Sequence, residues 1–502
     1  MRTEIVHVFL SPTYLVEHGL ELLVALEKAA AEMNLPIVIE GYPLARDLRI
    51  QNFSVTPDPG VIEVNIQPSS NWQDLKNVIN TIYENARLAR LSTEKFMLDG
   101  KRVGTGGGNH IVMGAAIPED SPFLRRPDLL RSLIAFWQNH PSLSYLFSAM
   151  YIGPTSQFPR VDEARSDSLY ELEIAFNQID NLAKESKPQS WLVDRIFRNL
   201  LVDITGNTHR AEFCIDKLFN PESNTGRLGL LEMRGFEMTP HPQMNLLQAL
   251  LVRAAIAAFW NKPYKQKLIN WGTKLHDRFM LPTYLLEDFH EVLDYLRESN
   301  YDFKSSWFEP FYNFRFPKLG EMNIEGIKLE LRTALEPWPV MGEEMNGSRV
   351  SRAVDSSVER IEVKLTGAIQ ERHVLTCNGI EVPLQITKRA GEYVAAIRFK
   401  AWSPYSSLHP MIQAHGPLVF DLVDKRYGRS IGACKYHVSH PGGRNYETYP
   451  VNENEADGRM LSCFELGGHS PANIEVIKHE PNFYFPHTLD LRFYPDFKPA
   501  LV

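Results

Sequence analysis

Hydrophobic residues in the first two thirds of the chain follow both helical and strand-like spacings. Between Trp72 and about Leu91, apolar residues recur as they do on one face of a helix. Short β-prone segments between turn residues, such as 61–66 and 111–113, predict strands. The same patterns predict further helices over 16–33, 127–139, 170–182, 191–201, 244–260 and 284–297, and further strands over 5–10, 36–40 and 228–237. Helices and strands mixed in this way are typical of an α+β domain.

The pattern changes near residue 341. Beyond it come short β-prone runs separated by Gly, Pro, Asn and Ser, over 361–365, 372–377, 393–399 and 418–422. Short strands with turn residues between them are typical of a small β-sandwich or barrel. We therefore expect a mixed domain over 1–340 and a C-terminal all-β domain over 341–502.

Composition and charge narrow the kinds of partner. The chain has 502 residues, of which 44% are hydrophobic and 23% are charged, as in a soluble globular protein. Its formal net charge of −8 argues against nucleic acid as a partner, because no excess of cations is present to bind phosphates. No apolar run reaches the roughly 20 residues of a membrane helix. The four cysteines are widely spaced, as in proteins of a reducing compartment. We expect a cytoplasmic protein with no membrane and no nucleic-acid partner.

A glycine-rich segment is the first candidate for a functional site. Residues 104–110 read Gly-Thr-Gly-Gly-Gly-Asn-His, and three consecutive glycines let the backbone approach a ligand closely. The segment lacks the Lys-Ser/Thr of a P-loop, and a glycine run alone is more often an ordinary turn. His110, at the start of a predicted strand, strengthens the case for a ligand-binding loop.

Two predicted strands carry polar or charged residues on one face. Glu63 and Asn65 alternate, so their side chains point to the same side, although a solvated strand face explains them equally well. Glu232 and Arg234 repeat the arrangement inside an apolar segment, where charges need compensation. A structural ion pair and a ligand-binding pair are both open for these two residues.

Polar residues also crowd the segment 206–213. Arg210 has the planar guanidinium that binds carboxylate or phosphate in a bidentate way. His209 by itself fits a structural hydrogen-bonding residue better than a ligand. Acids, one imidazole, arginines and a glycine loop suit Mg²⁺ or Mn²⁺ and the charge neutralisation of phosphoryl transfer. Taken alone, the same set fits a phosphatase or a simple metal-binding site equally well.

The order of these segments resembles glutamine synthetase, whose antiparallel sheet the chain would then share. The resemblance implies metal ligands at Glu63, His110 and Glu232, and phosphate- or carboxylate-binding catalytic roles for Arg210 and Arg234. It implies a substrate or nucleotide pocket formed by Asn65, Gly104, Thr105, Gly106, Gly107, Gly108, Asn109, His209 and Glu212. Two features depart from that pattern. Val112 stands in place of a second histidine, and Glu40 is the one substitute for an earlier acidic pair of metal ligands.

A nearer resemblance extends over almost the whole chain. It rests on the segments Pro57-Asp-Pro-Gly-Val-Ile-Glu-Val-Asn65, Gly104–His110, Ser144-Tyr-Leu-Phe147, Gly153-Pro-Thr-Ser-Gln157, Thr208-His-Arg-Ala-Glu-Phe-Cys-Ile-Asp-Lys217, Ala334-Leu-Glu-Pro-Trp338 and Tyr436-His-Val-Ser-His-Pro-Gly-Gly443. These resemble the putative amidoligase domain of bacterial transglutaminase-like proteins. Motifs this long and this numerous are specific for the family.

The two resemblances together imply an ATP- and Mg²⁺- or Mn²⁺-dependent ligase. ATP would activate the carboxylate of an amino acid, peptide or protein as an acyl phosphate, and an amine would then attack it. A transglutaminase-like or ATP-grasp protein is the implied protein partner. Two alternatives stay open, a non-catalytic peptide- or substrate-binding module and a metal-dependent hydrolase.

Overall fold

The structure is a computed structural model in which the chain forms two compact units, Met1–Val78 and Ile79–Val502. It describes residues 5–45, 47, 49–50, 52–58, 60–165, 167–182, 189–223, 225–346, 349–367, 369, 371–403, 407–438, 440–441, 446–467 and 474–494. Four residues of the family-like segments, Pro59, Ser439, Gly442 and Gly443, lie outside these ranges.

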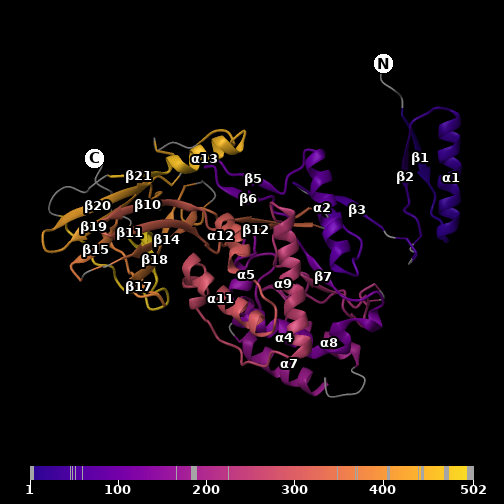
Figure 1. Ribbon diagram of the computed structural model, residues 1–502, viewed down its shortest axis with the longest axis horizontal. Helices are drawn as coiled ribbons and strands as arrows, with labels where there is room; N and C mark the ends of the chain where they lie inside the picture. Colours follow the sequence, from indigo (N-terminus) through magenta and orange to yellow (C-terminus); the bar gives the residue numbers. More distant parts are fainter. Residues whose placement is uncertain are drawn as a thin grey trace. The chain divides into compact units, whose positions relative to one another are not determined.

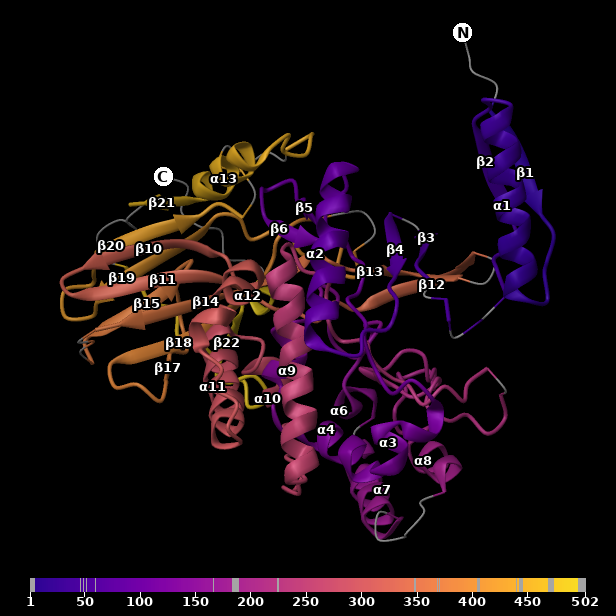
Figure 2. The ribbon, with the colours of Figure 1, turned by 45° about the vertical axis from the view of Figure 1, so that its right-hand side comes forward.

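The first unit contains a β-α-β arrangement followed by a hairpin. Its elements are β1 (Val6–Leu10), α1 (Val16–Glu32), β2 (Ile37–Gly41), β3 (Ser54–Asp58) and β4 (Val61–Asn65). Strands β1 and β2 pair in parallel, as Figure 2 shows beside α1, and β3 and β4 pair antiparallel. After α1, Asn34 adopts a left-handed φ of 50°, a conformation that Asn tolerates, and the chain turns there into β2.

Helices make up most of the first part of the second unit. They are α2 (Trp72–Leu88), η1 (Pro118–Asp120), α3 (Pro122–Arg125), α4 (Pro127–Asn139), α5 (Ser142–Tyr145), α6 (Val161–Ala164), α7 (Ser168–Leu182), α8 (Ser190–Phe197), α9 (Pro242–Asn261), α10 (Lys274–Asp277), α11 (Pro282–Glu298), η2 (Ser305–Phe308) and α12 (Glu309–Arg315). The boundary between the two units falls within the first of them, α2. Every residue of α4 is buried, and α4 and α9 pack together in the core of this part (Figure 1).

Helix α9 is long and apolar enough to cross a membrane, and it is the one such helix among the described residues. However, 61% of its 18-residue apolar stretch is buried inside the protein, and the helix packs against α4 and α11. That burial is typical of the core helix of a globular protein.

Short strands lie between these helices. They form a pair, β5 (Glu94–Phe96) with β6 (Arg102–Gly104), and a three-stranded antiparallel sheet in the order β7 (Ile111–Met113), β9 (Leu231–Met233), β8 (Phe213–Cys214). The central strand β9 thus joins two segments that lie about a hundred residues apart in the sequence.

Two larger sheets follow. The first contains β10 (Lys318–Ile324), β11 (Ile327–Ala334), β14 (Val358–Thr366), β18 (Glu392–Lys400), β17 (Gln385–Ile386) and β22 (Thr488–Asp490), and the second contains β16 (Ile380–Glu381), β15 (His373–Cys377), β19 (Leu418–Asp424), β20 (Arg429–Tyr436) and β21 (Phe464–Leu466). One hydrophobic cluster takes side chains from both sheets, such as Leu331, Val363, Phe420 and Cys434. The remaining elements are the hairpin β12 (Val340–Asn346) and β13 (Arg349–Val354), α13 (Glu453–Ser462) and η3 (Leu491–Phe493).

The mixed α+β class predicted from the sequence is confirmed. The glutamine-synthetase-like sheet stays a prediction, because the described strands before residue 234 pair in separate sheets of two or three strands. The boundary at 340/341 and a separate C-terminal β domain also stay predictions. The first large sheet itself contains strands from both sides of residue 341.

Candidate active site

The sheet β7-β9-β8 brings together residues from three separate segments. Val112 and Cys214 both pair with Glu232, so β7 and β8 flank the middle of β9. His110 lies directly before β7, and Arg234 directly after β9. Antiparallel register therefore places the ends of these strands next to one another.

Glu232 is the centre of a charged cluster at this point. Its side chain is only 4% exposed, and its Oε1 lies 3.1 Å from His110 Nδ1 and accepts a hydrogen bond of 2.7 Å from Arg234. Its Oε2 accepts a hydrogen bond of 3.1 Å from Lys217 Nζ. Burial opposes ionisation, but the His110 hydrogen bond and the charges of Arg234 and Lys217 outweigh it and hold the pKa of Glu232 well below its ordinary value. Glu232 is therefore an ionised carboxylate in a buried site.

His209 extends this cluster on the side of β8. Arg234 NH1 lies 3.2 Å from His209 Nε2, and the other ring nitrogen, Nδ1, lies 3.5 Å from Asp216 Oδ2 and 3.8 Å from Cys214 Sγ. Asp216 is also bound by Arg198, at 3.3 Å. Both ring nitrogens of His209 thus have polar neighbours, and the roles considered for it in the sequence stay predictions.

The glycine segment holds His110 in place, and two of its glycines are required by close contacts. A Cβ on Gly108 would lie 2.6 Å from His110 Nε2, so only glycine leaves room for the imidazole ring. A Cβ on Gly104 would lie 2.3 Å from Glu237 Oε1, and the Gly104 N–H donates to this carboxylate. Gly106 adopts a φ of 97°, and the loop turns at this point.

Backbone and amide contacts fasten the rest of this loop to the chain after β9. Gly107 O accepts a hydrogen bond from Met238 N, and Asn109 N donates to Phe236 O. The Asn109 side chain donates to Gln248 at 2.7 Å and accepts from Asn245 at 3.0 Å, so it is bound to α9. Thr105 lies in the same loop, between Gly104 and Gly106. Asn109 thus fastens the glycine loop to α9.

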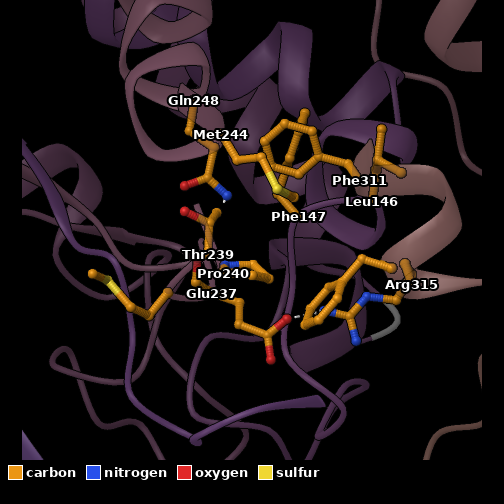
Figure 3. A pocket seen from close by; sticks show the side chains of 11 residues that line it. Leu146, Phe147, Glu237, Thr239, Pro240, Met244, Gln248, Phe311 and Arg315 are labelled. Atoms are coloured by element: carbon orange, nitrogen blue, oxygen red, sulfur yellow. Dashed lines mark hydrogen bonds and ion pairs between the residues drawn. The ribbon is translucent and has the colours of Figure 1, made fainter. Parts of the chain in front are cut away.

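Behind the loop lies a small pocket with a buried ion pair. Figure 3 shows the Glu237 carboxylate facing the Arg315 guanidinium at its base, and both side chains are more than nine-tenths buried. Apolar side chains line the rest, among them Phe147, Met244 and Phe311. Because Glu237 also accepts the Gly104 N–H, the ion pair anchors the glycine loop to α12.

The backbone carbonyl of Glu212 accepts a hydrogen bond from Arg234 N, while its side chain has other partners than the Glu232 cluster. Its side chain is buried against Gly235, in a second pocket with Ser144 and Arg160. Burial raises the pKa of Glu212 to about 7, although the charge of Arg160 and a hydrogen bond from Ser144 act against the rise. The sequence placed Glu212 in the substrate pocket, and this role stays a prediction.

Arg210 has other partners than the Glu232 cluster. Its buried guanidinium lies 3.3 Å from Glu343 Oε1 and 3.8 Å from Asp203 Oδ2. Arg352 binds the same two carboxylates. These contacts are those of a structural ion-pair network, so a phosphate-binding role for Arg210 stays a prediction that would require Glu343 to move.

Three predicted residues belong to the first unit. Glu40 lies on β2, and its Oε1 is 2.6 Å from His7 Nδ1. Both side chains are about half exposed. Glu63 and Asn65 lie on β4, exposed, opposite Thr56 and Ser54 of β3. Convergence of Glu40 and Glu63 with His110 and Glu232 on one metal ion stays a prediction.

The structure adds residues that the sequence analysis did not select. Three of them, Lys217, Cys214 and Asp216, lie within the family-like segment 208–217, so their residue types were visible in the sequence. The contact of Lys217 with Glu232, and those of the other two with His209, were not. Glu237 and Arg315 lie 78 residues apart, and no local pattern connects them.

Fold and site together describe an α+β protein with a buried, ionised acid beside a histidine and two cations. That description fits enzymes that handle anionic substrates. The chain belongs to the family described as "Putative amidoligase enzyme (DUF2126)", whose sequence model matches residues 1–492. The predicted family membership is thereby confirmed, and the family's description gives a ligase-type activity. No curated protein and no solved structure matches the chain.

Proposed function

We propose that this protein is an ATP- and Mg²⁺-dependent carboxylate–amine ligase. A carboxylate oxygen of an amino acid, peptide or protein takes the γ-phosphoryl group of ATP, and ADP leaves. The nitrogen of an amine then attacks the carbonyl carbon of the acyl phosphate, phosphate leaves, and the amine proton passes to a base or to water. The observation that carries the proposal is the cluster of Glu232, His110 and Arg234 in a chain of the amidoligase family.

The donor set at Glu232 fits a divalent cation. Two adjacent ligands of an octahedral ion with bonds of about 2.1 Å lie about 3.0 Å apart, and His110 Nδ1 lies 3.1 Å from Glu232 Oε1. Lys217, which binds the other oxygen, is 47% exposed, so it can turn into solvent and leave that oxygen free. Glu232 and His110 would hold Mg²⁺ or Mn²⁺, which when bound neutralises charge on the phosphates. Glu63 and Glu40 are further ligands that the family resemblance implies.

Arg234 is suited to bind an anion in this site. Its NH1 contacts Glu232 and His209, while its buried Nε has no hydrogen-bond partner among the described residues. A buried guanidinium N–H without a partner is costly, and a phosphate or carboxylate oxygen would satisfy it. Arg234 would therefore orient the anionic substrate and stabilise the charge that develops during phosphoryl transfer.

The glycine loop and its neighbours would form the wall of the pocket. Gly108 leaves space for the His110 ring, and Glu237 and α9 hold the loop still. A rigid support of this kind keeps a metal-binding imidazole in one orientation. Asn65, Thr105, His209 and Glu212 would contribute polar groups for substrate or nucleotide. The amine, the carboxylate and a transglutaminase-like or ATP-grasp partner follow from the family resemblance.

Thermal shift tests the proposal with Mg²⁺ alone and with Mg²⁺ plus ATP. We expect the pair to raise the melting temperature, and the effect to be lost in His110→Ala and Glu63→Ala. His290→Ala is the matched control, because His290 lies on the far helix α11 and bonds only to Ser305 among the contacts described for it. Phosphate release from ATP in the presence of amine and carboxylate candidates is the second readout.

Each alternative function gives a different result in the same experiment. A non-catalytic binding module predicts no shift under any condition. A metal-dependent hydrolase predicts stabilisation by the metal without ATP. Either result would overturn the ligase proposal.

A further inference from the structure

Three metal-binding side chains gather around one end of β8. His209 precedes the strand, Cys214 is its last residue, and Asp216 follows in the next turn. One donor atom of each lies within 4.8 Å of the other two. His209 Nδ1 is 3.8 Å from Cys214 Sγ and 3.5 Å from Asp216 Oδ2.

These distances match the edges of a tetrahedral zinc site. With a Zn–S bond of 2.3 Å and Zn–N and Zn–O bonds near 2.1 Å, ligands at the tetrahedral angle are about 3.6 Å apart for S and N and about 3.4 Å apart for N and O. The two observed separations exceed these values by only about 0.1–0.2 Å. Metal–ligand bond lengths themselves vary by ~0.2 Å. Two of the three separations therefore fit the site, and the third, between Cys214 and Asp216, is within 4.8 Å.

The exposure of the three side chains suits an ion that enters from solvent. Cys214 is buried, whereas His209 is 55% exposed and Asp216 is 27% exposed. The imidazole and the carboxylate can therefore take up the ion at the surface, with the thiol beneath them. A fourth position would stay open to water or another ligand, as in zinc sites with three protein ligands.

We propose that His209, Cys214 and Asp216 form a transition-metal site with Zn²⁺ as its natural occupant. A thiolate selects zinc over Mg²⁺, so this site differs in chemistry from the Mg²⁺ site proposed at Glu232 and His110. On binding, Cys214 Sγ releases its proton to water and His209 binds through Nδ1. This proposal does not rest on the ligase activity.

Neighbouring cations do not prevent the binding. Arg198 contacts Asp216, but it also holds Asp194 through hydrogen bonds of 2.9 and 3.0 Å. It therefore keeps a partner when Asp216 turns toward an ion. Burial and the charges of Asp216 and Glu232 raise the pKa of the Cys214 thiol to about 11, so the ion has to displace a proton that the thiol holds at neutral pH.

Occupancy of the site is coupled to Arg234 through the histidine ring. In the structure Arg234 NH1 lies 3.2 Å from His209 Nε2, where a guanidinium N–H can donate only to an unprotonated nitrogen. A metal on Nδ1 of the neutral ring leaves the proton on Nε2, which then cannot accept. Metal binding at His209 and the Arg234–His209 hydrogen bond therefore exclude each other, and zinc turns Arg234 toward Glu232 alone.

The test is a titration of chelator-treated protein with Co²⁺ in excess Mg²⁺. We expect the visible bands of tetrahedral Co²⁺ and a sulfur-to-cobalt charge-transfer band, both removed by Zn²⁺. Cys214→Ser loses the charge-transfer band, while Cys463→Ser, the same change at a buried thiol in the hydrophobic cluster of the large sheets, keeps it. No band in the wild type, or a band that survives in Cys214→Ser, would overturn the proposal.

Two further variants guard against misfolding and test the coupling. His209→Gln changes a half-exposed side chain and should leave the circular dichroism spectrum intact. The Co²⁺ affinity should fall by at least roughly 10–100-fold, which is the loss caused by removing a residue that only supports a metal ligand. Unchanged affinity in His209→Gln contradicts the site. Arg234→Met removes the competing hydrogen bond and should bind Co²⁺ roughly two- to tenfold more tightly. Equal or weaker binding contradicts the coupling.

Discussion

Replacing the buried carboxyl of Glu212 by an amide should change how the stability of the protein depends on pH. Glu212 is buried beside Arg160, which donates at 2.8 Å to Ser144 Oγ, and Ser144 in turn donates to Glu212. Glu163 and Asp162 lie near enough to repel a negative charge there. Burial is the largest cause of the shift and raises the pKa of Glu212 from its ordinary value of 4.5 to about 7.

The sign and the size of the effect follow from this shift. Between the unfolded pKa of 4.5 and the folded pKa of about 7, the folded protein binds more protons than the unfolded chain. Stability therefore falls as the pH rises through this window, and the loss is complete above it. A shift of this size corresponds to roughly 3 kcal/mol at most. Glu212→Gln stays neutral, so it should be more stable than the wild type at pH 8 and similar at pH 5.

Urea unfolding at pH 5 and pH 8, followed by far-ultraviolet circular dichroism, measures this difference. The quantity of interest is the change in unfolding midpoint between the two pH values, variant against wild type. Glu362, another buried carboxyl with a pKa raised to about 7, leaves a residual slope in both proteins. Glu173→Gln, on an exposed position of α7, is the control and should follow the wild type. If Glu212→Gln also follows the wild type, the reasoning about this carboxyl is refuted.

Two further predictions concern the support of the glycine loop, both measured by thermal denaturation. Arg315→Met leaves Glu237 buried without its partner and should cost roughly 3–5 kcal/mol, whereas Arg297→Met, in an exposed helix pair, should change little. A similar loss in both variants would contradict a role for burial. Gly104→Ala places a Cβ against the Glu237 carboxylate and should cost about 1–3 kcal/mol. Gly458→Ala, in α13 with open space around it, should be neutral or stabilising by up to about 1 kcal/mol. Equal effects of the two alanines would contradict the close contact.

Local periodicity was sufficient for most of the regular elements. The helix predicted over 127–139 and the strand predicted over 111–113 have these bounds in the structure, and α7, α9 and α11 differ from their predictions by at most two residues at each end. A helix or strand with one or two apolar faces repeats every few residues, so its signal is contained in a short window. The predicted α+β class follows from the same windows.

Two elements are shorter than the sequence predicted. The strand predicted over 228–237 is paired only at Leu231–Met233, because β7 and β8 offer partners over that length. The helix predicted over 191–201 ends at Phe197. The hairpin of β10 and β11, which opens the first large sheet, was not predicted. Its alternating apolar residues lie before the change in composition near residue 341, and the all-β part was expected only beyond that change.

The sequence by itself determined the family, the chemical types in the site and most of the helices. His110, Glu232 and Arg234 could be selected one by one, because a glycine loop and charges inside an apolar strand are local features. Only the tertiary structure decided which of them touch. The register of β7, β9 and β8 brings His110 and Lys217 to Glu232, while Arg210 pairs with Glu343, 133 residues away. Contacts between residues far apart in the chain arise from packing and strand register, and neither leaves a trace in local spacing.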